Sequence, residues 1–214
     1  VERPAHRSKA YDKDRFEVCN HRYSALCDAA HGAAVLNDCK YGISMNGNSL
    51  ELTLLRAPSA PEMRADNKVH HFTYAFTAWE GTFADCDVVR QGYDLNVPAL
   101  VMPGSSSRFS LAEVDRENII LDTMKPAEDG SEDIILRLYE SKKAAVTARI
   151  HTAFEGYTPY VCDMLENILE EAPVENGDIL LSFRHKAFYI IYSLYHVFCK
   201  YFTAVFGNKC VIFY

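Results

Sequence analysis

Short runs of alternating apolar and polar residues recur along the chain between turn-forming residues. Alternation with a period of two is typical of strands that bury one face. The predicted strands are residues 15–19, 33–36, 41–45, 49–56, 70–77, 118–124, 134–139, 145–151, 161–165 and 178–183. Because these strands are short and separated by turn signals, the predicted fold class is all-β, an antiparallel β-sandwich.

The most specific turn signal is Asn46-Gly47, which predicts a type I′ turn between residues 41–45 and 49–55. Alternate residues of a strand share one face, so this hairpin and the strand at 70–77 each have a predicted core face. The residues predicted to be buried on these faces are Leu52, Leu54, Phe72, Tyr74 and Phe76.

Two proline-containing segments interrupt the pattern. Residues 57–67 hold two prolines and many polar groups, which predicts an exposed loop longer than an ordinary hairpin connection. Residues 103–107 read Pro-Gly-Ser-Ser-Ser and mark either a crossing between sheets or a subdomain boundary. We therefore divide the chain into a connecting arm, residues 1–14, a sandwich region, residues 15–184, and a tail, residues 185–214.

The tail has a different period. From Phe188 to Phe206 the apolar residues follow a spacing of about 3.6, which predicts an aromatic helix outside the cooperative fold. A frameshift into AT-rich sequence is one explanation, because Phe, Tyr, Ile, Lys and Asn codons are rich in A and T. A membrane anchor over residues 187–206 is another, although His196 and Lys200 are costly in a bilayer. A helix docked on the sandwich is the third.

Composition narrows the class of protein. The 214 residues are 49% hydrophobic and 24% charged, as in globular domains. The net charge is -7, and no basic run is longer than Lys142-Lys143, which argues against nucleic acid and anionic membranes as partners. Seven cysteines without a C-x-x-C pair favour reduced thiols and a cytoplasmic protein. Residues 1–7 contain no signal-peptide core, and we expect the chain to begin inside a longer protein.

Catalytic motifs are missing from the sequence. It contains no G-x-S-x-G, P-loop, H-E-x-x-H or dinucleotide-binding turn. Adjacent His70 and His71 point to opposite faces of a strand, and an acidic pair such as Asp85 and Asp87 is typical of a solvated turn. We predict no catalytic residue, no metal ligand and no cofactor within this chain.

One polar segment is distinctive, the sequence Leu-Asn-Asp-Cys-Lys-Tyr-Gly from Leu36 to Gly42. Taken alone, it predicts a turn whose Asn and Asp side chains bond the backbone while Lys40 faces water. Together with residues 15–19, 54–58 and 71–75, it resembles the C-terminal β region of family 38 α-mannosidases, especially their cytosolic and bacterial branch. The similarity continues through residues 92–98 and 135–140 and covers about residues 1–184.

The resemblance implies a fold of super-sandwich type and a role in a retaining exo-α-mannosidase that removes terminal α-mannose. It also implies that zinc and the catalytic carboxylates lie in an N-terminal domain missing from this chain, which alone is expected to be inactive. The implied partners are that N-terminal catalytic domain and, through the parent enzyme, an α-mannosyl oligosaccharide. A membrane is an implied partner only if the tail, residues 185–214, is an anchor.

The resemblance also supplies candidate residues for the edge of the sugar site or for an interdomain contact. These residues are Asn37, Asp38, Lys40, Tyr41 and Arg56. For Arg56, an ion pair and a contact with a sugar hydroxyl are both open. The alternative function is a free-standing carbohydrate-binding or scaffolding β domain, which needs an exposed aromatic platform. Trp79 and Tyr74 are the candidates, but Tyr74 lies on a predicted core face and Trp79 ends a strand.

Overall fold

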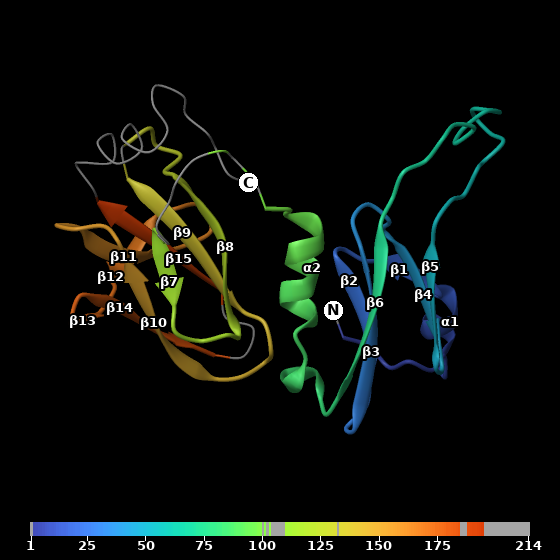
Figure 1. The fold of residues 1–214 in the computed structure, drawn as a ribbon, viewed down its shortest axis with the longest axis horizontal. Helices are drawn as coiled ribbons and strands as arrows, with labels where there is room; N and C mark the ends of the chain where they lie inside the picture. The colour runs from blue at the N-terminus through green and yellow to red at the C-terminus, as the bar shows by residue number, and fades with distance from the viewer. Residues whose placement is uncertain are drawn as a thin grey trace. The chain divides into compact units, whose positions relative to one another are not determined.

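A computed structural model of the chain describes residues 2–99, 101, 103, 110–131, 133–184 and 188–194. The chain forms two compact units, Val1–Pro103 and Gly104–Tyr214, which are described separately below (Figure 1). Their boundary falls in the Pro-Gly-Ser segment, so of the two interpretations of residues 103–107 the subdomain boundary agrees with the structure.

The first unit contains two small antiparallel sheets and three short helical segments. One sheet has the order β1-β4-β5 and the other β2-β3-β6. The strands are β1 (Glu17–Cys19), β2 (Tyr23–Cys27), β3 (His31–Asn37), β4 (Gly42–Asn46), β5 (Ser49–Thr53) and β6 (Tyr74–Glu80). The helical segments are α1 (Ala10–Asp14), the 3-10 helix η1 (Phe83–Asp85) and α2 (Val88–Asn96).

The β4–β5 hairpin forms as predicted, but its turn is displaced by one residue. Asn46 pairs with Ser49, so the two loop residues are Gly47 and Asn48. Gly47 has a φ of 60°, whereas Asn48 does not have a positive φ. A type I′ turn requires positive φ at both loop residues, and the predicted turn type is therefore wrong.

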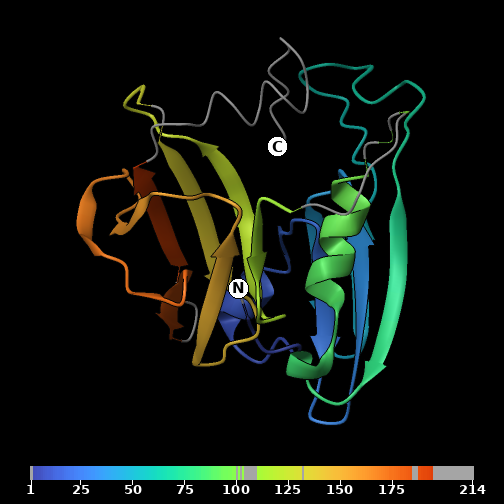
Figure 2. The ribbon, with the colours of Figure 1, turned by 60° about the vertical axis from the view of Figure 1, so that its left-hand side comes forward.

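Helix α2, which the sequence reasoning missed, covers one face of the β2-β3-β6 sheet (Figure 2). Val88, Val89 and Gly92 are buried on it, an i, i+1, i+4 pattern typical of an amphipathic helix. A Cβ at Gly92 would lie 3.3 Å from the Tyr23 ring, so glycine allows the helix to approach the sheet closely. Ala34, Cys86 and Val88 form the small core beneath it.

The core face predicted for β6 is wrong. Tyr74 is 60% exposed and Phe76 is 73% exposed, and Leu54 beyond β5 is 39% exposed. The residues of β6 that face the helix-covered side are Thr77 and Trp79, the partners of Ala34 and Gly32. Of the five predicted core residues, Leu52 and Phe72 are half-buried. The alternation was correctly recognised, but the opposite face carries the packing.

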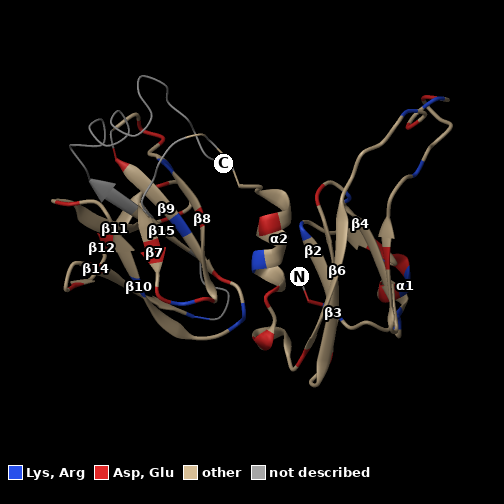
Figure 3. Ribbon diagram, in the orientation of Figure 1, with Lys and Arg blue, Asp and Glu red and all other residues tan. Residues whose placement is uncertain are grey.

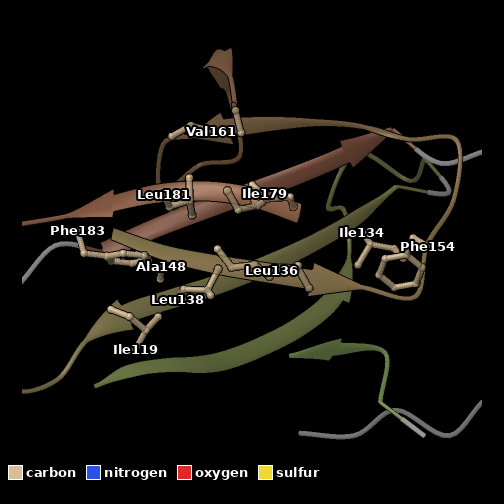
Figure 4. Packing of buried hydrophobic residues seen from close by; sticks show 13 residues of the cluster. Ile119, Ile134, Leu136, Leu138, Ala148, Phe154, Val161, Ile179, Leu181 and Phe183 are labelled. Atoms are coloured by element: carbon tan, nitrogen blue, oxygen red, sulfur yellow. The ribbon is translucent and has the colours of Figure 1, made fainter. Parts of the chain in front are cut away.

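The second unit is a sandwich of two antiparallel sheets, ordered β13-β14-β10-β7 and β12-β11-β15-β9-β8. The strands are β7 (Ala112–Val114), β8 (Ile119–Pro126), β9 (Ile134–Glu140), β10 (Val146–Thr152), β11 (Thr158–Cys162), β12 (Ile168–Glu171), β13 (Val174–Glu175), β14 (Asp178–Phe183) and β15 (Phe188–Leu194). Side chains from both sheets fill the space between them (Figure 4). The predicted all-β sandwich is confirmed.

Strand β15 contradicts the predicted helical tail. It lies between β9 and β11 in the larger sheet, paired antiparallel with both. Ile190 and Ile191 are 1% and 0% exposed. Over Phe188–Leu194 the chain is therefore a central strand of the fold, and the prediction that the fold ends at Arg184 is wrong. Residues 195–214, including most of the predicted anchor, lie outside the described residues.

A partly buried ion network connects β8, β9 and the segment between β11 and β12. Lys125 Nζ lies 2.7 Å from Glu166 Oε1, and Arg137 Nη2 lies 3.3 Å from the same oxygen. Burial raises the pKa of Glu166. This effect is outweighed by hydrogen bonds from Lys125 and from the Glu128 N–H, together with the positive charges of Lys125 and Arg137. The net result is a pKa below the ordinary glutamate value, so the ionised form stabilises the folded unit.

Charges of both signs are interspersed along each unit, and the described residues show no extended basic strand or helix (Figure 3). The described residues also include no helix of the length and apolar character that a membrane crossing requires.

Candidate functional site

The distinctive segment Leu36–Gly42 forms the connection between β3 and β4. Asn37 ends β3 and is 1% exposed. Its Oδ1 accepts a hydrogen bond from Lys40 N at 2.7 Å, which closes the turn. Its backbone carbonyl accepts one from Asn96 Nδ2 at 3.1 Å, which links the turn to the end of α2. Asn37 therefore fixes the turn and its position against the helix.

Asp38 connects the turn to the segment that enters β6. Its backbone N–H donates to the Thr73 carbonyl at 3.2 Å, and the Thr73 N–H donates to its carboxylate at 2.9 Å. Hydrogen bonds from the Cys39 thiol and then from the Thr73 N–H lower the pKa of Asp38, and the same carboxylate raises the pKa of Cys39. Asp38 is thus an ionised acceptor in the framework of the turn.

Lys40 and Tyr41 extend from this framework. Lys40 Nζ lies 4.6 Å from the centre of the Phe72 ring, a cation–π contact. Tyr41 is 53% exposed and stacks on His21, with ring centres 5.9 Å apart and planes 11° apart. Among the four candidates Asn37, Asp38, Lys40 and Tyr41, Tyr41 is the exposed residue.

Arg56 belongs to a second cluster, across the β1-β4-β5 sheet. Its Nη2 lies 2.5 Å from Glu17 Oε2, and Thr53 Oγ1 donates to Glu17 Oε1 at 2.5 Å. The Thr53 hydrogen bond and then that from Arg56 lower the pKa of Glu17. The ion pair, one of the two possibilities for Arg56, is present in the structure, and a contact between Arg56 and sugar stays a prediction.

Gly42 belongs to the distinctive segment and also contacts the cluster of Glu17, Thr53 and Arg56. Because Gly42 has no side chain, space is left for the Glu17 carboxylate. A Cβ at Gly42 would lie 2.6 Å from Glu17 Oε1 and 3.0 Å from Thr53 Cβ. Glu17 pairs with Ser44, and Gly42 pairs with Thr53, so the Glu17 side chain crosses β4 to reach β5. Sequence reasoning missed Glu17 and Thr53, since only the register of three strands brings them together.

The other polar groups considered from sequence have structural contacts. Asp85 accepts hydrogen bonds from the Thr82 N–H and hydroxyl, both at 2.8 Å, at the start of η1. His70 Nε2 lies 2.7 Å from the Asp66 carbonyl oxygen. Trp79 is half-buried, and its Nε1–H donates to the Thr82 carbonyl at 3.0 Å. Trp79 therefore packs as a core residue and is not an exposed platform.

The zinc implied by the resemblance has no matching set of ligands in the part of the chain that the structure describes. There, no three His, Cys, Asp or Glu side chains converge on a point that could hold a metal ion. Zinc sites take at least three such ligands, so the described residues do not fit the ion.

Comparison with known proteins identifies the family. Residues 1–64 match the family model "Glycosyl hydrolases family 38 C-terminal domain", and residues 118–190 match "Glycosyl hydrolases family 38 C-terminal beta sandwich domain". The second match runs past Arg184, so the prediction that the family pattern stops there is wrong.

Curated relatives and a solved structure agree with these matches. Human "Alpha-mannosidase 2C1" is 39% identical over 172 residues, 78% of this chain and 16% of the relative. "Alpha-mannosidase" of Saccharomyces cerevisiae is 31% identical over 171 residues, 71% of this chain and 16% of the relative. A solved α-mannosidase of Enterococcus faecalis V583 has a similar fold, with a TM-score of 0.64 at 12% identity, covering 82% of this chain and 21% of that chain.

The chain spans about one sixth of the length of the curated relatives it matches. Two regions of the chain match models of one family, in the order expected of its C-terminal part, and the fold agrees. The resemblance inferred from the segment Leu36–Gly42 and its neighbours is confirmed. The chain belongs to the glycosyl hydrolases of family 38 and corresponds to their C-terminal region.

Proposed function

We propose that this chain is the C-terminal, non-catalytic β region of a retaining exo-α-mannosidase that removes terminal α-mannose from oligosaccharides. The observation that supports this most directly is the identity to relatives named α-mannosidases over most of this chain. The chain would support a catalytic domain located in the remaining five sixths, approximately, of such a protein.

The chemistry is assigned to that other part. A retaining glycosidase needs two free carboxyl groups about 5 Å apart, one as nucleophile and one as acid/base. The carboxylates at the candidate site already accept structural hydrogen bonds, Glu17 from Thr53 and Arg56, and Asp38 from Thr73. We place the nucleophile, the acid/base and the zinc in the catalytic domain, where zinc would hold sugar hydroxyls.

Within the complete enzyme, Lys40 and Tyr41 are proposed to lie at the edge of the sugar site or at the contact with the catalytic domain. Asn37 and Asp38 would act indirectly, by holding the turn that presents them. A sugar contact predicts that Tyr41→Ala raises KM with little change in thermal stability. An interdomain contact predicts that Tyr41→Ala lowers the melting temperature and leaves KM nearly unchanged.

The main test is hydrolysis of 4-nitrophenyl α-mannoside by the purified 214-residue chain and by a longer family 38 protein that includes it. We expect turnover only from the longer protein, and stoichiometric zinc only in the longer protein, measured by atomic absorption. Zinc-dependent turnover by the 214-residue chain alone would contradict the proposal.

A free-standing carbohydrate-binding domain is the second candidate, and one observation favours it. Tyr74 is exposed and stacks on Phe72 with ring centres 6.3 Å apart, so the objection that Tyr74 is a core residue no longer holds. Calorimetric titration of the isolated chain with α-mannose oligosaccharides separates the two functions. Binding that Tyr74→Ala abolishes would support the second candidate.

A cytoplasmic location is part of the proposal. Cys19, Cys27, Cys39, Cys86 and Cys162 are free thiols, and the first three are exposed. Exposed free thiols suit a reducing compartment. Thiol titration of protein purified from its cells under alkylating conditions should show these cysteines reduced.

A further inference from the structure

The β2-β3-β6 sheet has two faces that differ in how they are covered. The pairing registers place Ala34 opposite Ala25 on β2 and opposite Thr77 on β6. Ala34 and its neighbours on this side pack beneath α2 and η1. This face is therefore covered by helices of the first unit itself, with which it forms a small core.

The other face, which we call the β6 face, carries no charged side chain between its ends. The same registers define its members, which are Ser24, Leu26, Ala33, Val35, Asn37, Tyr74, Phe76 and Ala78. Asn37 is buried and the other members on β2 and β3 are half-buried, whereas Phe76 is 73% exposed and Tyr74 is 60% exposed. His31 and Glu80 pair at one end and form a polar boundary.

Strand β6 is also an edge strand, paired only with β3 among the described strands (Figure 2). Exposed edges are normally protected by Lys, Pro, bulges or a covering element. β6 reads Tyr-Ala-Phe-Thr-Ala-Trp-Glu and contains neither Lys nor Pro, and it pairs with β3 without a register shift. An open edge beside two exposed aromatic rings is typical of a surface that another segment of protein covers.

We propose that the β6 face and the outer edge of β6 bind the preceding part of the same polypeptide in the longer enzyme. This inference rests on the proposed function. The relatives are about six times longer than the matched segment, and the family models assign this segment to the C-terminal part, so most of their polypeptide precedes it. The β6 face would then be an internal contact of the enzyme.

The chemistry of the face fits a permanent contact better than a transient one. Permanent interfaces are more apolar and resemble a divided core, whereas transient ones keep a largely polar composition. A covalently linked partner is also present at a high effective concentration, so it needs no charges for steering. A sugar site, by contrast, needs converging polar groups. This face offers the hydroxyls of Ser24 and Tyr74, while the amide of Asn37 is buried and its Oδ1 already accepts a hydrogen bond from the Lys40 N–H.

Hydroxyl-radical footprinting with mass spectrometry tests this directly, because exposed aromatic rings are oxidised readily. The isolated 214-residue chain is compared with a chimera in which this chain replaces the matching segment of human α-mannosidase 2C1. A tyrosine-containing peptide in each sample reports the radical dose. We expect oxidation of Tyr74 and Phe76 to fall roughly fivefold in the chimera, because a packed contact excludes water. Equal oxidation in both proteins would overturn the proposal.

Two other occupants have different signatures, and either would overturn the proposal. A second copy of the chain gives protection of Phe76 in the isolated chain that increases with protein concentration. A carbohydrate gives protection of Tyr74 on addition of α-mannose oligosaccharides.

A paired set of variants removes the ambiguity of a chimera that fails to fold. Tyr74→Ser with Phe76→Ser should leave the urea midpoint of the isolated chain unchanged but should prevent the isolated chain from binding human α-mannosidase 2C1 that lacks its matching segment. Met164→Ser with Leu165→Ser, at two exposed apolar residues of the second unit, is the matched control. Equal binding by both double variants would contradict the proposal.

Activity of the chimera on 4-nitrophenyl α-mannoside is recorded separately. Protection of Phe76 without turnover supports the docking surface but contradicts the proposed function. Turnover without protection of Phe76 supports the proposed function and contradicts the docking surface.

Discussion

Removal of residues 185–214 is expected to unfold the second unit, because it deletes the central strand of the larger sheet. Strand β15 is paired with β9 along Phe188–Ser193 and with β11 along Ile190–Leu194. Its deletion would separate these two neighbours and expose the core residues that Ile190 and Ile191 cover. A chain that ends at Leu194 keeps the strand and should fold.

The size of the effect follows from burial. Ile190 and Ile191 are 1% and 0% exposed, and burial of each such side chain stabilises a fold by about 1.5–3 kcal/mol. Loss of both removes about 3–6 kcal/mol before any lost backbone hydrogen bond is counted, against a typical domain stability of about 5–15 kcal/mol. Within the intact chain, Ile191→Ala should cost about 2–5 kcal/mol and Ile191→Val about 0.5–1.5 kcal/mol.

The assay must observe the two units separately, because two units need not unfold together. The single tryptophan, Trp79, lies in the first unit, so its fluorescence reports that unit. Amide hydrogen exchange of β9 and β11 reports the second. Chains ending at Arg184, Leu194 and Tyr214 are compared, and only the first should lose protection in β9 and β11. If the chain ending at Arg184 keeps that protection, the central position of β15 is wrong.

Three further predictions concern other parts of the chain. Gly42→Ala should destabilise the first unit by about 1–3 kcal/mol in urea unfolding followed by tryptophan fluorescence, and by less in a Glu17→Ala background, because the added methyl group meets that carboxylate. Phe76→Ala should change stability by less than about 1 kcal/mol, whereas Leu36→Ala should cost about 2–5 kcal/mol, since Leu36 is 3% exposed. The lowered pKa of Glu166 stabilises the second unit above the unfolded-state pKa, so the circular-dichroism urea midpoint should fall as the pH decreases from about 5 toward 3.

Four strands of the second unit, β8, β9, β10 and β14, were predictable because their signal is local. Residues 134–139 and 178–183 are apolar runs bounded by turn residues, and they correspond to β9 and β14 to within one residue. Strands buried in a sandwich have such runs, and no information about their partners is needed to recognise them. The strand predicted at residues 161–165 lies three residues too late, since β11 is Thr158–Cys162. β7, β12 and β13, short strands of two to four residues, were missed, as was β2 of the first unit.

The helix predicted for the tail shows how a long window can hide a local signal. The 3.6 spacing was counted as far as Phe206, but Phe188–Leu194 alone is rich in aromatic and β-branched residues, which favour a strand. A run of this length is ambiguous by periodicity, and composition decides it. The strand also needs β9 and β11 as partners, which no local pattern contains.

For β6, alternation defined two faces but not which of them is covered. That choice depends on α2, whose signal was present in the sequence but not used: Val88, Val89 and Gly92 follow a helical spacing, and Pro98 comes shortly after the helix ends. With the helix recognised, the small residues Gly32 and Ala34 of β3 indicate which face receives it. Phe76 must then lie on the opposite face of the sheet, which α2 does not cover.

The segment Leu36–Gly42 combines two kinds of residue, and this affects how variants in it should be interpreted. Asn37, Asp38 and Gly42 are engaged with the chain itself, through the Lys40 N–H, the Thr73 backbone and the space for Glu17. Their substitution disturbs the turn whatever the turn does, so loss of function there carries no information about ligand contact. Tyr41 is different, because 53% of its surface is exposed and its ring stacks on His21. A functional role of this segment is therefore to be sought at Tyr41, with Asn37→Ala as the variant that shows what loss of the turn alone produces.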